Sequence, residues 1–155
     1  MFQLKKTMDE CFIQEGKMSL PNQYFAGRVG SKFIIALRDA KKILGVRCPV
    51  CDKVYCPPRE YCDVDLTKLD ENWVELGSEG VITNFTVVNY NDKHLPRRAP
   101  FVMALIKLDG ADTPVGHIVE GIAPDLVQIG MRVKAVFAEK TTNTIRDIDH
   151  FEPIS

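Results

Sequence analysis

The segment CPVCDKVYCPPREYCDVD, residues 48–65, restricts the fold of this chain more than any other stretch. It contains four cysteines within fifteen positions and ends on an aspartate. Structural zinc sites take four ligands, commonly two from each of two tight turns. Cys48 and Cys51 have the two-residue spacing of one such turn. Because roughly twenty residues bury too little apolar surface to fold alone, the segment is predicted to hold a structural metal ion with four protein ligands.

The other two ligands have a less regular spacing. Cys62 is the predicted third ligand, since the PPR turn before it can return the chain to the first pair. Asp65 has the two-residue spacing after Cys62, and a carboxylate can bind zinc, whereas Cys56 would supply the softer thiolate of a four-cysteine site. We favour Cys56 and keep Asp65 as the alternative. The predicted metal ligands are therefore Cys48, Cys51, Cys56 and Cys62.

The first cysteine pair has two alternative interpretations. A redox pair of the thioredoxin type needs a strand before it and a helix after it, but Cys48 follows a predicted helix. A chance group of buried apolar thiols is the other alternative. Two further cysteines within the next eleven residues favour a zinc site over a redox pair and over a chance group of thiols. Cys11 stands apart and is predicted to be an ordinary thiol.

A helix is predicted immediately before the cysteines. Over residues 31–45 apolar side chains recur at helical spacing, with Ser31 placed to cap the first turn and Gly45 to end the last one. Residues 1–20 show weak periodicity and few helix breakers. They are predicted to form a loose helix or an arm.

After an acidic connector, the sequence pattern changes to short strands. A small helical turn, started by Pro124 and ended by Gly130, precedes the fourth long strand. Five short strands with such a turn are typical of a Greek-key barrel of the OB type. The predicted class is α+β, mainly β, with an N-terminal arm and helix at 1–45, a zinc ribbon at 46–66 and an OB-fold barrel at 67–155. The predicted strands are WVEL, GVITNFTVVNY, FVMALIKL, GHIVEGI, MRVKAVFAE and TIRDIDHF.

Composition and charge restrict the class of protein further. No apolar run reaches the roughly 20 residues of a membrane helix, and no signal peptide is evident, so a soluble cytoplasmic protein is expected. In that compartment thiols stay reduced, and clustered cysteines favour metal over disulfide. Residues 1–61 carry 11 Lys and Arg against 6 Asp and Glu, residues 62–92 carry 1 against 7, and residues 93–155 balance at 8 against 8. The basic half suits an anionic ligand or an acidic partner, or is an ordinary solvated face.

The sequence offers no clear catalytic centre. Cysteine-based acyl transfer needs a nucleophile, a base and an oxyanion hole. Cys11 has no histidine near it in the sequence, and His94, His117 and His150 are scattered. No GxSxG, P-loop, HExxH or GxGxxG motif is present. The chain is predicted to be non-catalytic on its own.

Several stretches together resemble one protein family. They are YFAGRVGSKFIIALRDAKKILGVRCPVC, CPPREYC, Trp73, GVITNFTVVNY, PFVMALIKLDG and IGMRVKAVF. Between about residues 24 and 139 the chain resembles acyl-CoA-associated proteins that have an N-terminal helix, a rubredoxin-like zinc ribbon and a C-terminal OB fold. Members of that family partner thiolase-fold enzymes. Within the family, the chain is similar to the zinc-finger subunits of benzoylsuccinyl-CoA thiolases of anaerobic toluene degradation.

The resemblance implies a non-catalytic accessory subunit of a thiolase-type acyl-CoA C-acyltransferase complex. In such a hetero-oligomer the chain would stabilise the catalytic subunit and help to form its acyl-CoA site. The implied cofactor is a structural zinc ion, and no nucleic acid or membrane is implied. The family has cysteine at the position of Asp65 and an aromatic residue at the position of Cys56, so a relocated fourth ligand would explain both departures.

The resemblance also directs attention to the basic residues. Coenzyme A carries a pyrophosphate and a 3′-phosphate, so its binding favours Arg and Lys beside an apolar groove. The residues expected to contact these phosphates are Lys93, Arg97 and Arg98, in the loop KHLPRR. A second basic cluster lies within residues 41–59.

Two further expectations concern partners. Apolar residues of the arm and helix, Tyr24, Phe25 and Phe33, are expected to meet the enzyme subunit. The alternative function is a nucleic-acid-binding module, because zinc ribbons and OB barrels both serve that role. That role needs a basic groove with aromatic platforms, but residues 93–155 are charge-balanced. A rubredoxin-like iron protein would need four regularly spaced cysteines.

Overall fold

The computed structural model describes residues 16, 18, 20 and 22–154, and this part is mainly β with one α-helix. Helix α1 spans Gly27–Ala40, so it begins before the expected cap Ser31 and ends before the expected stop at Gly45. Lys41 ends the helix, because its left-handed backbone (φ 51°) turns the chain while its N–H still bonds into the last helical turn. Most of residues 1–20, including Cys11, lie outside the described residues.

The ribbon is a three-stranded antiparallel sheet in the order β2-β1-β3. Its strands are β1 (Ile43–Arg47), β2 (Val54–Tyr55) and β3 (Trp73–Leu76). Gly45 does not end the helix but lies inside β1. The neighbouring strand is so close there that a Cβ would come within 3.1 Å of the Tyr55 carbonyl oxygen. The ribbon sheet therefore extends beyond the expected 46–66 on both sides, and the strand at Trp73 pairs with the ribbon.

The rest of the chain forms a closed five-stranded barrel in the order β4-β5-β6-β8-β7. β4 pairs with β7 to close it, and β6 pairs with β8 in the only parallel pairing among the described barrel strands. This order confirms the OB fold, including the predicted turn η1 (Pro124–Leu126) before β7. The barrel strands are β4 (Glu79–Val88), β5 (Phe101–Leu108), β6 (Val115–Val119), β7 (Arg132–Phe137) and β8 (Ile148–Pro153), with the turn η2 (Ile145–Asp147) before β8.

One hydrophobic core runs from the helix through the ribbon into the barrel. Phe33 and Leu37 of α1 pack in the same buried cluster as barrel residues such as Ile106 and Phe151. The expectation that Phe33 is exposed is therefore wrong, because it lies on the inner stripe of α1 and is 4% exposed. Tyr24 and Phe25 precede the helix and are exposed as expected. A second, smaller cluster within the ribbon contains Val46, Cys48, Tyr55, Cys62 and Leu69.

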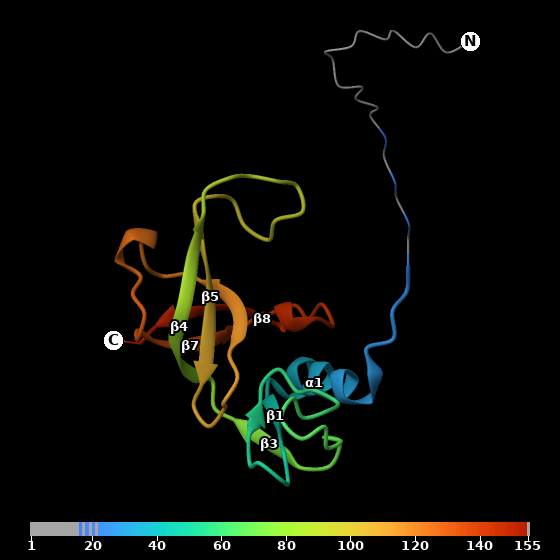
Figure 1. Cartoon of the computed structure of the whole chain (residues 1–155). Helices are drawn as coiled ribbons and strands as arrows, with labels where there is room; N and C mark the ends of the chain where they lie inside the picture. Colours follow the sequence, from blue (N-terminus) through green and yellow to red (C-terminus); the bar gives the residue numbers. More distant parts are fainter. Residues whose placement is uncertain (1–15, 17, 19, 21, 155) are drawn as a thin grey trace, which may run out of the picture.

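Figure 1 shows how these parts are arranged. Helix α1 and the ribbon strands lie together at one end of the barrel, and the long β4–β5 loop projects at the opposite end. Residues 22–26, before α1, lead away from the helix and the ribbon in this view. Within the described residues, no helix is long and apolar enough to cross a membrane.

Candidate metal centre

Two turns of the ribbon, knuckle 1 (residues 48–53) and knuckle 2 (residues 62–67), have the same backbone geometry. In each, the N–H of the fifth residue bonds to the carbonyl of the first cysteine, Asp52 to Cys48 at 3.1 Å and Leu66 to Cys62 at 3.2 Å. In each, the cysteine N–H bonds to the carbonyl of the sixth residue at 2.9 Å. Asp52 and Leu66 both have a left-handed backbone, with φ of 64° and 60°. Knuckle 2 thus repeats the turn of knuckle 1, although an aspartate stands in its fourth position.

The knuckles bring three thiols and one carboxylate together. Ligand atoms of Cys48, Cys51, Cys62 and Asp65 all lie within 4.8 Å of one another. The sulfurs of Cys51 and Cys62 are 3.5 Å apart, and the Cys48 sulfur lies 3.3 Å from Oδ2 of Asp65. Cys48 and Cys62 are buried, Asp65 is half-buried and Cys51 is exposed. These four residues are placed to bind a metal ion.

Hydrogen bonds favour the charged form of Asp65 and offset charge at the first cysteine of each knuckle. Hydrogen bonding by Thr67, whose N–H lies 2.9 Å from Oδ1, holds the pKa of the Asp65 carboxyl well below its usual range. The N–H groups of Val50 and Val64 each lie 3.4 Å from the sulfur of the first cysteine in their own knuckle. Such donors offset part of the charge of a thiolate. Three sulfurs and one oxygen fit a tetrahedral structural site with no open position.

Cys56, the preferred fourth ligand, lies outside this group, and the structure brings the alternative, Asp65, together with the three thiols instead. Side chains alternate along β2 and just beyond it, so Tyr55 faces the ribbon cluster with the donors while Cys56 faces the main core. Cys56 is 1% exposed, and burial raises the pKa of its thiol to about 12. Its backbone N–H bonds to Thr113 Oγ1 at 2.8 Å. A buried neutral thiol in an apolar cluster is a structural side chain.

Tyr55 is a residue of the site that the sequence analysis missed. Its hydroxyl lies 3.2 Å from the Cys62 sulfur and also bonds to the Asp63 carboxylate. Burial, followed by the bond to Asp63, raises the pKa of the Tyr55 hydroxyl above its usual range. Tyr55 therefore supports the Cys62 sulfur through a hydrogen bond. The alternation of β2 is the signal that could have identified it.

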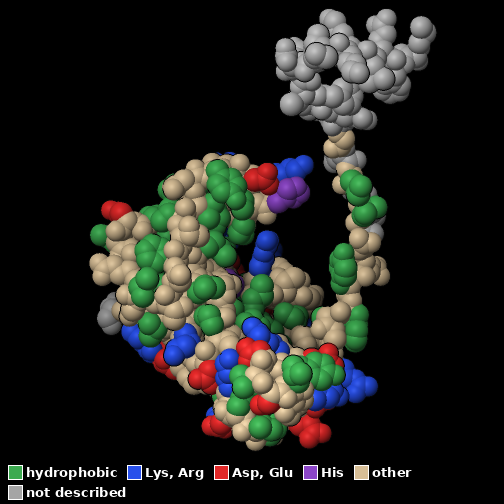
Figure 2. Space-filling view, in the orientation of Figure 1, with side chains coloured by type: hydrophobic (Ala, Val, Ile, Leu, Met, Phe, Trp, Pro, Cys, Tyr) green, Lys and Arg blue, Asp and Glu red, His purple; other side chains and the backbone are tan. Residues whose placement is uncertain are grey.

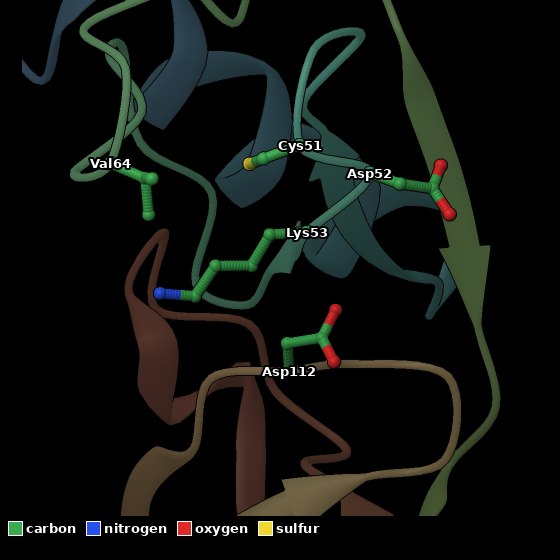
Figure 3. Close-up of a pocket in the computed structure, with 5 residues that line it drawn as sticks. All are labelled: Cys51, Asp52, Lys53, Val64 and Asp112. Atoms are coloured by element: carbon green, nitrogen blue, oxygen red, sulfur yellow. The ribbon is translucent and has the colours of Figure 1, made fainter.

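Cys51 faces an open depression between the ribbon and the barrel. Figure 3 shows Cys51, Lys53 and Val64 around it, with Asp112 entering from the β5–β6 loop. The Asp112 carboxylate accepts a hydrogen bond from the Val54 N–H at 2.7 Å, and the Asp112 N–H bonds to the Val54 carbonyl at 2.8 Å. The barrel loop thus pairs with the free edge of β2 and fixes the ribbon on the barrel.

The basic residues expected to meet phosphates lie together in the β4–β5 loop, but they are not equivalent. Arg97 is paired with Glu120 at 2.5 Å and with Asp149 at 2.9 Å, so it ties the loop to β8 and to the residue after β6. Lys93 and Arg98 are exposed. In the second basic cluster, several residues likewise form ion pairs with carboxylates of the ribbon.

An apolar groove of about 420 Å³ lies beside this loop on the barrel. His117 contributes to it but is 4% exposed, packs against the Phe151 ring, and has its pKa lowered by burial. The hydrogen bonds of His117 and His150 go to the Ile145 carbonyl and to Asp149, not to a thiol. The groove is lined by Val88, Tyr90, Leu95, Pro96, Phe101, Met103, Gly116, His117, Ile118, Ile145 and Arg146.

Comparisons with known proteins agree with this architecture. A profile of the C-terminal OB-fold domain of ChsH2 matches residues 73–138. A DUF35 domain-containing scaffold protein of Methanocaldococcus jannaschii is 37% identical over 101 residues, which are 65% of this chain and 71% of the relative. A probable enoyl-CoA hydratase alpha subunit of Thermomonospora curvata is 30% identical over 93 residues, 60% of this chain and 28% of that protein. A chain of the solved Ltp2-ChsH2(DUF35) aldolase has the same fold, with a TM-score of 0.60, 24% identity, and coverage of 79% of this chain and 93% of its own.

The likeness extends over both parts of the molecule. The profile match falls on the barrel and β3, and the identity to the M. jannaschii protein covers more than two thirds of that relative. The chain therefore belongs to the DUF35 family, and its C-terminal barrel is an OB-fold domain of the ChsH2 type.

Proposed function

We propose that this chain is a non-catalytic scaffold subunit that binds a structural zinc ion and partners a thiolase-fold enzyme. The observation that carries the proposal is the preformed group of three thiols and one carboxylate in a DUF35 chain. Cys48, Cys51, Cys62 and Asp65 would hold the ion. The M. jannaschii relative is named a scaffold protein, and the solved aldolase consists of Ltp2 and ChsH2(DUF35). These names support an enzyme as the partner.

The described side chains support a role without chemistry of its own. Three of the four described cysteines belong to the metal group, and Cys56 is buried in the core. Within the described residues, no thiol therefore has the accessible setting beside a base that a nucleophile needs. The zinc ion, when bound, supplies structural cross-linking of the two knuckles. The chain's own part is to present a folded surface to the enzyme.

The same complex is proposed to act on acyl-CoA. Exposed Lys93 and Arg98 belong to the loop whose Leu95 and Pro96 line the apolar groove, a combination that suits the phosphates and the acyl part of such a thioester. Arg97 would position the loop through its carboxylate partners. The likeness to an enoyl-CoA hydratase subunit supports a CoA thioester as ligand. Benzoylsuccinyl-CoA, cleaved by free CoA, is the specific substrate proposed.

Nucleic-acid binding has less support. Of the two rings that line the groove from β5 and the β4–β5 loop, Tyr90 is 66% exposed but Phe101 is only 6% exposed, so the groove does not present a row of stacking platforms. Arg97 is occupied by two carboxylates. A strongly basic face is therefore lacking among the described residues of this loop.

Co-expression of the full chain with a thiolase-fold subunit encoded beside it tests the proposal. We expect the two to co-purify and to cleave 3-oxoacyl-CoA thioesters, benzoylsuccinyl-CoA among them. Replacing Lys93→Glu and Arg98→Glu together should raise KM for the thioester by at least about tenfold, since even one charge-assisted hydrogen bond contributes roughly 1.5–3 kcal/mol. The matched control Lys107→Glu with Lys134→Glu, two exposed barrel lysines, should leave KM unchanged. Salt-sensitive binding to single-stranded DNA, without binding to the enzyme subunit, would favour the alternative.

A further inference from the structure

The segment before α1 carries a group of large apolar side chains that stand in solvent. Met18 is 84% exposed, Leu20 69%, Tyr24 86% and Phe25 85%. Figure 2 shows hydrophobic side chains along this segment standing clear of the body of the protein. Exposed apolar groups that gather in this way commonly mark interaction sites.

The hydrophobic core of the described structure is formed without these side chains. Helix α1 already buries its own apolar stripe, formed by Val29, Phe33 and Leu37. Gly27, the first residue of the helix, has a φ of 72°, a backbone conformation that favours glycine, so the chain changes direction where the segment enters the helix. The segment is therefore directed away from the core that its neighbouring helix joins.

The charge around the segment has one sign. Residues 16–38 contain no Asp or Glu, and their charged residues are Lys17, Arg28, Lys32 and Arg38. Arg38 is paired with Asp39 at 2.6 Å, immediately after this stretch. The stretch from residue 16 to Arg38 is accordingly basic in sequence, and Asp70 of the ribbon interacts electrostatically with Arg28.

Two of these cations lie on the outer face of α1. Arg28 and Lys32 are both exposed and are one helical turn apart, and Ile35 follows them at 48% exposed. The Lys32 ammonium lies 4.3 Å from the centre of the Trp73 ring, which restricts its position. A partner that covers the apolar segment would meet these cations beside it.

We infer that residues 22–25 and the outer face of α1 form a docking segment for the enzyme subunit. Tyr24 and Phe25 enter an apolar groove of that subunit, and Asp and Glu at the rim of the groove meet Arg28 and Lys32. The inference rests on the proposed function and adds the segment that docks and the chemistry of the surface that receives it. A protein groove fits better than an anionic membrane, because membrane-binding stretches carry about 4–8 clustered Lys and Arg. Here Asn22 and Gln23 also interrupt the apolar side chains.

Calorimetric titration of the full chain with the purified thiolase-fold subunit tests the inference. Replacing Tyr24→Ser and Phe25→Ser together should weaken binding by about 30-fold or more, as expected for interface hot spots. Replacing Arg28→Glu and Lys32→Glu should weaken binding by about tenfold and reduce its dependence on salt. The control Leu126→Ser with Ile129→Ser removes side chains that are 57% and 66% exposed elsewhere on the surface. It should change Kd by less than about twofold.

Each outcome separates the docking segment from the proposed function. If the wild-type chain binds and the Tyr24/Phe25 variant binds equally well, the docking segment is wrong and the scaffold function stands. If the wild-type chain does not bind the subunit, both are wrong. Vesicles of phosphatidylserine and phosphatidylcholine provide the other probe. Vesicle binding that depends on Tyr24 and Phe25, with enzyme binding unaffected, overturns the inference in favour of a membrane.

Discussion

The ribbon and the barrel are ordered by different means. The barrel closes five strands around fully buried side chains such as Ile82, Ile106 and Phe151. The ribbon has three short strands, and two of the five residues in its own buried cluster, Cys48 and Cys62, belong to the metal group. Apolar burial is therefore expected to hold the barrel, whereas the outer part of the ribbon is expected to depend on the proposed metal ion.

The comparison also shows how the two regions are joined. One face of β2 belongs to the main core through Val54 and Cys56, and the other face belongs to the ribbon through Tyr55. The β5–β6 loop, through Asp112 and Thr113, bonds to the backbone of Val54 and Cys56. The two-residue strand β2 thus connects the barrel core to the ribbon cluster that contains the metal-group cysteines.

Removing the proposed metal ion should produce the largest difference in stability between the ribbon and the barrel. A strong chelator is expected to raise amide hydrogen exchange over residues 48–69 by at least about 100-fold, because structural metal binding contributes many kcal/mol to local folding. Strands β4 and β5 should remain protected. Hydrogen exchange read by mass spectrometry checks both regions in one experiment. Equal loss of protection in ribbon and barrel would contradict their separate dependence.

The reverse test weakens the barrel core. Phe151→Ala should lower the free energy of unfolding by about 3–5 kcal/mol, because it leaves a cavity at a fully buried position. Urea unfolding followed by circular dichroism measures the loss. The control Phe25→Ala, at a site that is 85% exposed, should cost less than about 0.5 kcal/mol. A small effect of Phe151→Ala would show that the barrel does not depend on its core.

The identity of the fourth ligand is the next test. Asp65→Asn keeps the shape of the side chain but removes its charge, and it should lower metal affinity by roughly 10- to 100-fold. Cys56→Ala should leave metal affinity unchanged and reduce stability by about 1–2 kcal/mol through loss of buried volume. Competition with a chromophoric chelator measures affinity for both variants. The opposite pattern would restore Cys56 as the ligand.

The link between the regions should have a moderate effect. Asp112→Ala removes the carboxylate that accepts a hydrogen bond from the buried Val54, and should cost about 1–2 kcal/mol. Exchange of the Val54 amide should increase more than exchange in β4. Asp125→Ala, an exposed aspartate of η1, serves as the control. An unchanged Val54 amide would show that the loop does not hold β2.

The smallest expected effect concerns the surface ion pairs of the β4–β5 loop. Hydrogen bonds from His150 and Arg97 lower the pKa of the Asp149 carboxyl. The stabilisation of the folded state by these hydrogen bonds is therefore fully present above the usual aspartate pKa of about 3.9. It is lost as the pH falls through the lowered pKa of Asp149 in the folded state. Since the Arg97 and Asp149 side chains are partly exposed, Arg97→Gln should cost only about 0.5 kcal/mol at neutral pH. The urea midpoints of the wild type and of Arg97→Gln should converge as the pH is lowered. A difference between them that grows on acidification would contradict the stabilising effect assigned to the ionised Asp149.

The sequence predicts features that depend on nearby residues better than features that depend on distant pairing. The OB barrel could be predicted because strand alternation and the Pro124 turn are local signals. The end of the helix could not, because residues 43–47 become a strand only by pairing with Trp73–Leu76. The ion pairs of Arg97 join residues 23 and 52 positions away, beyond any local pattern.

The candidate site shows the same division. Cys48, Cys51 and Cys62 could be selected from spacing alone. The fourth position required the alternation of β2, which directs Cys56 toward the main core and leaves Asp65 beside the thiols. For choosing the fourth ligand, the preference of zinc for thiolates was therefore less informative than the direction in which the backbone places each side chain.

Native mass spectrometry of the co-expressed chain and thiolase-fold subunit tests the scaffold function most directly. A hetero-oligomer whose mass includes one zinc ion per copy of this chain is the expected result. A metal-free chain that does not associate with the subunit would contradict the account.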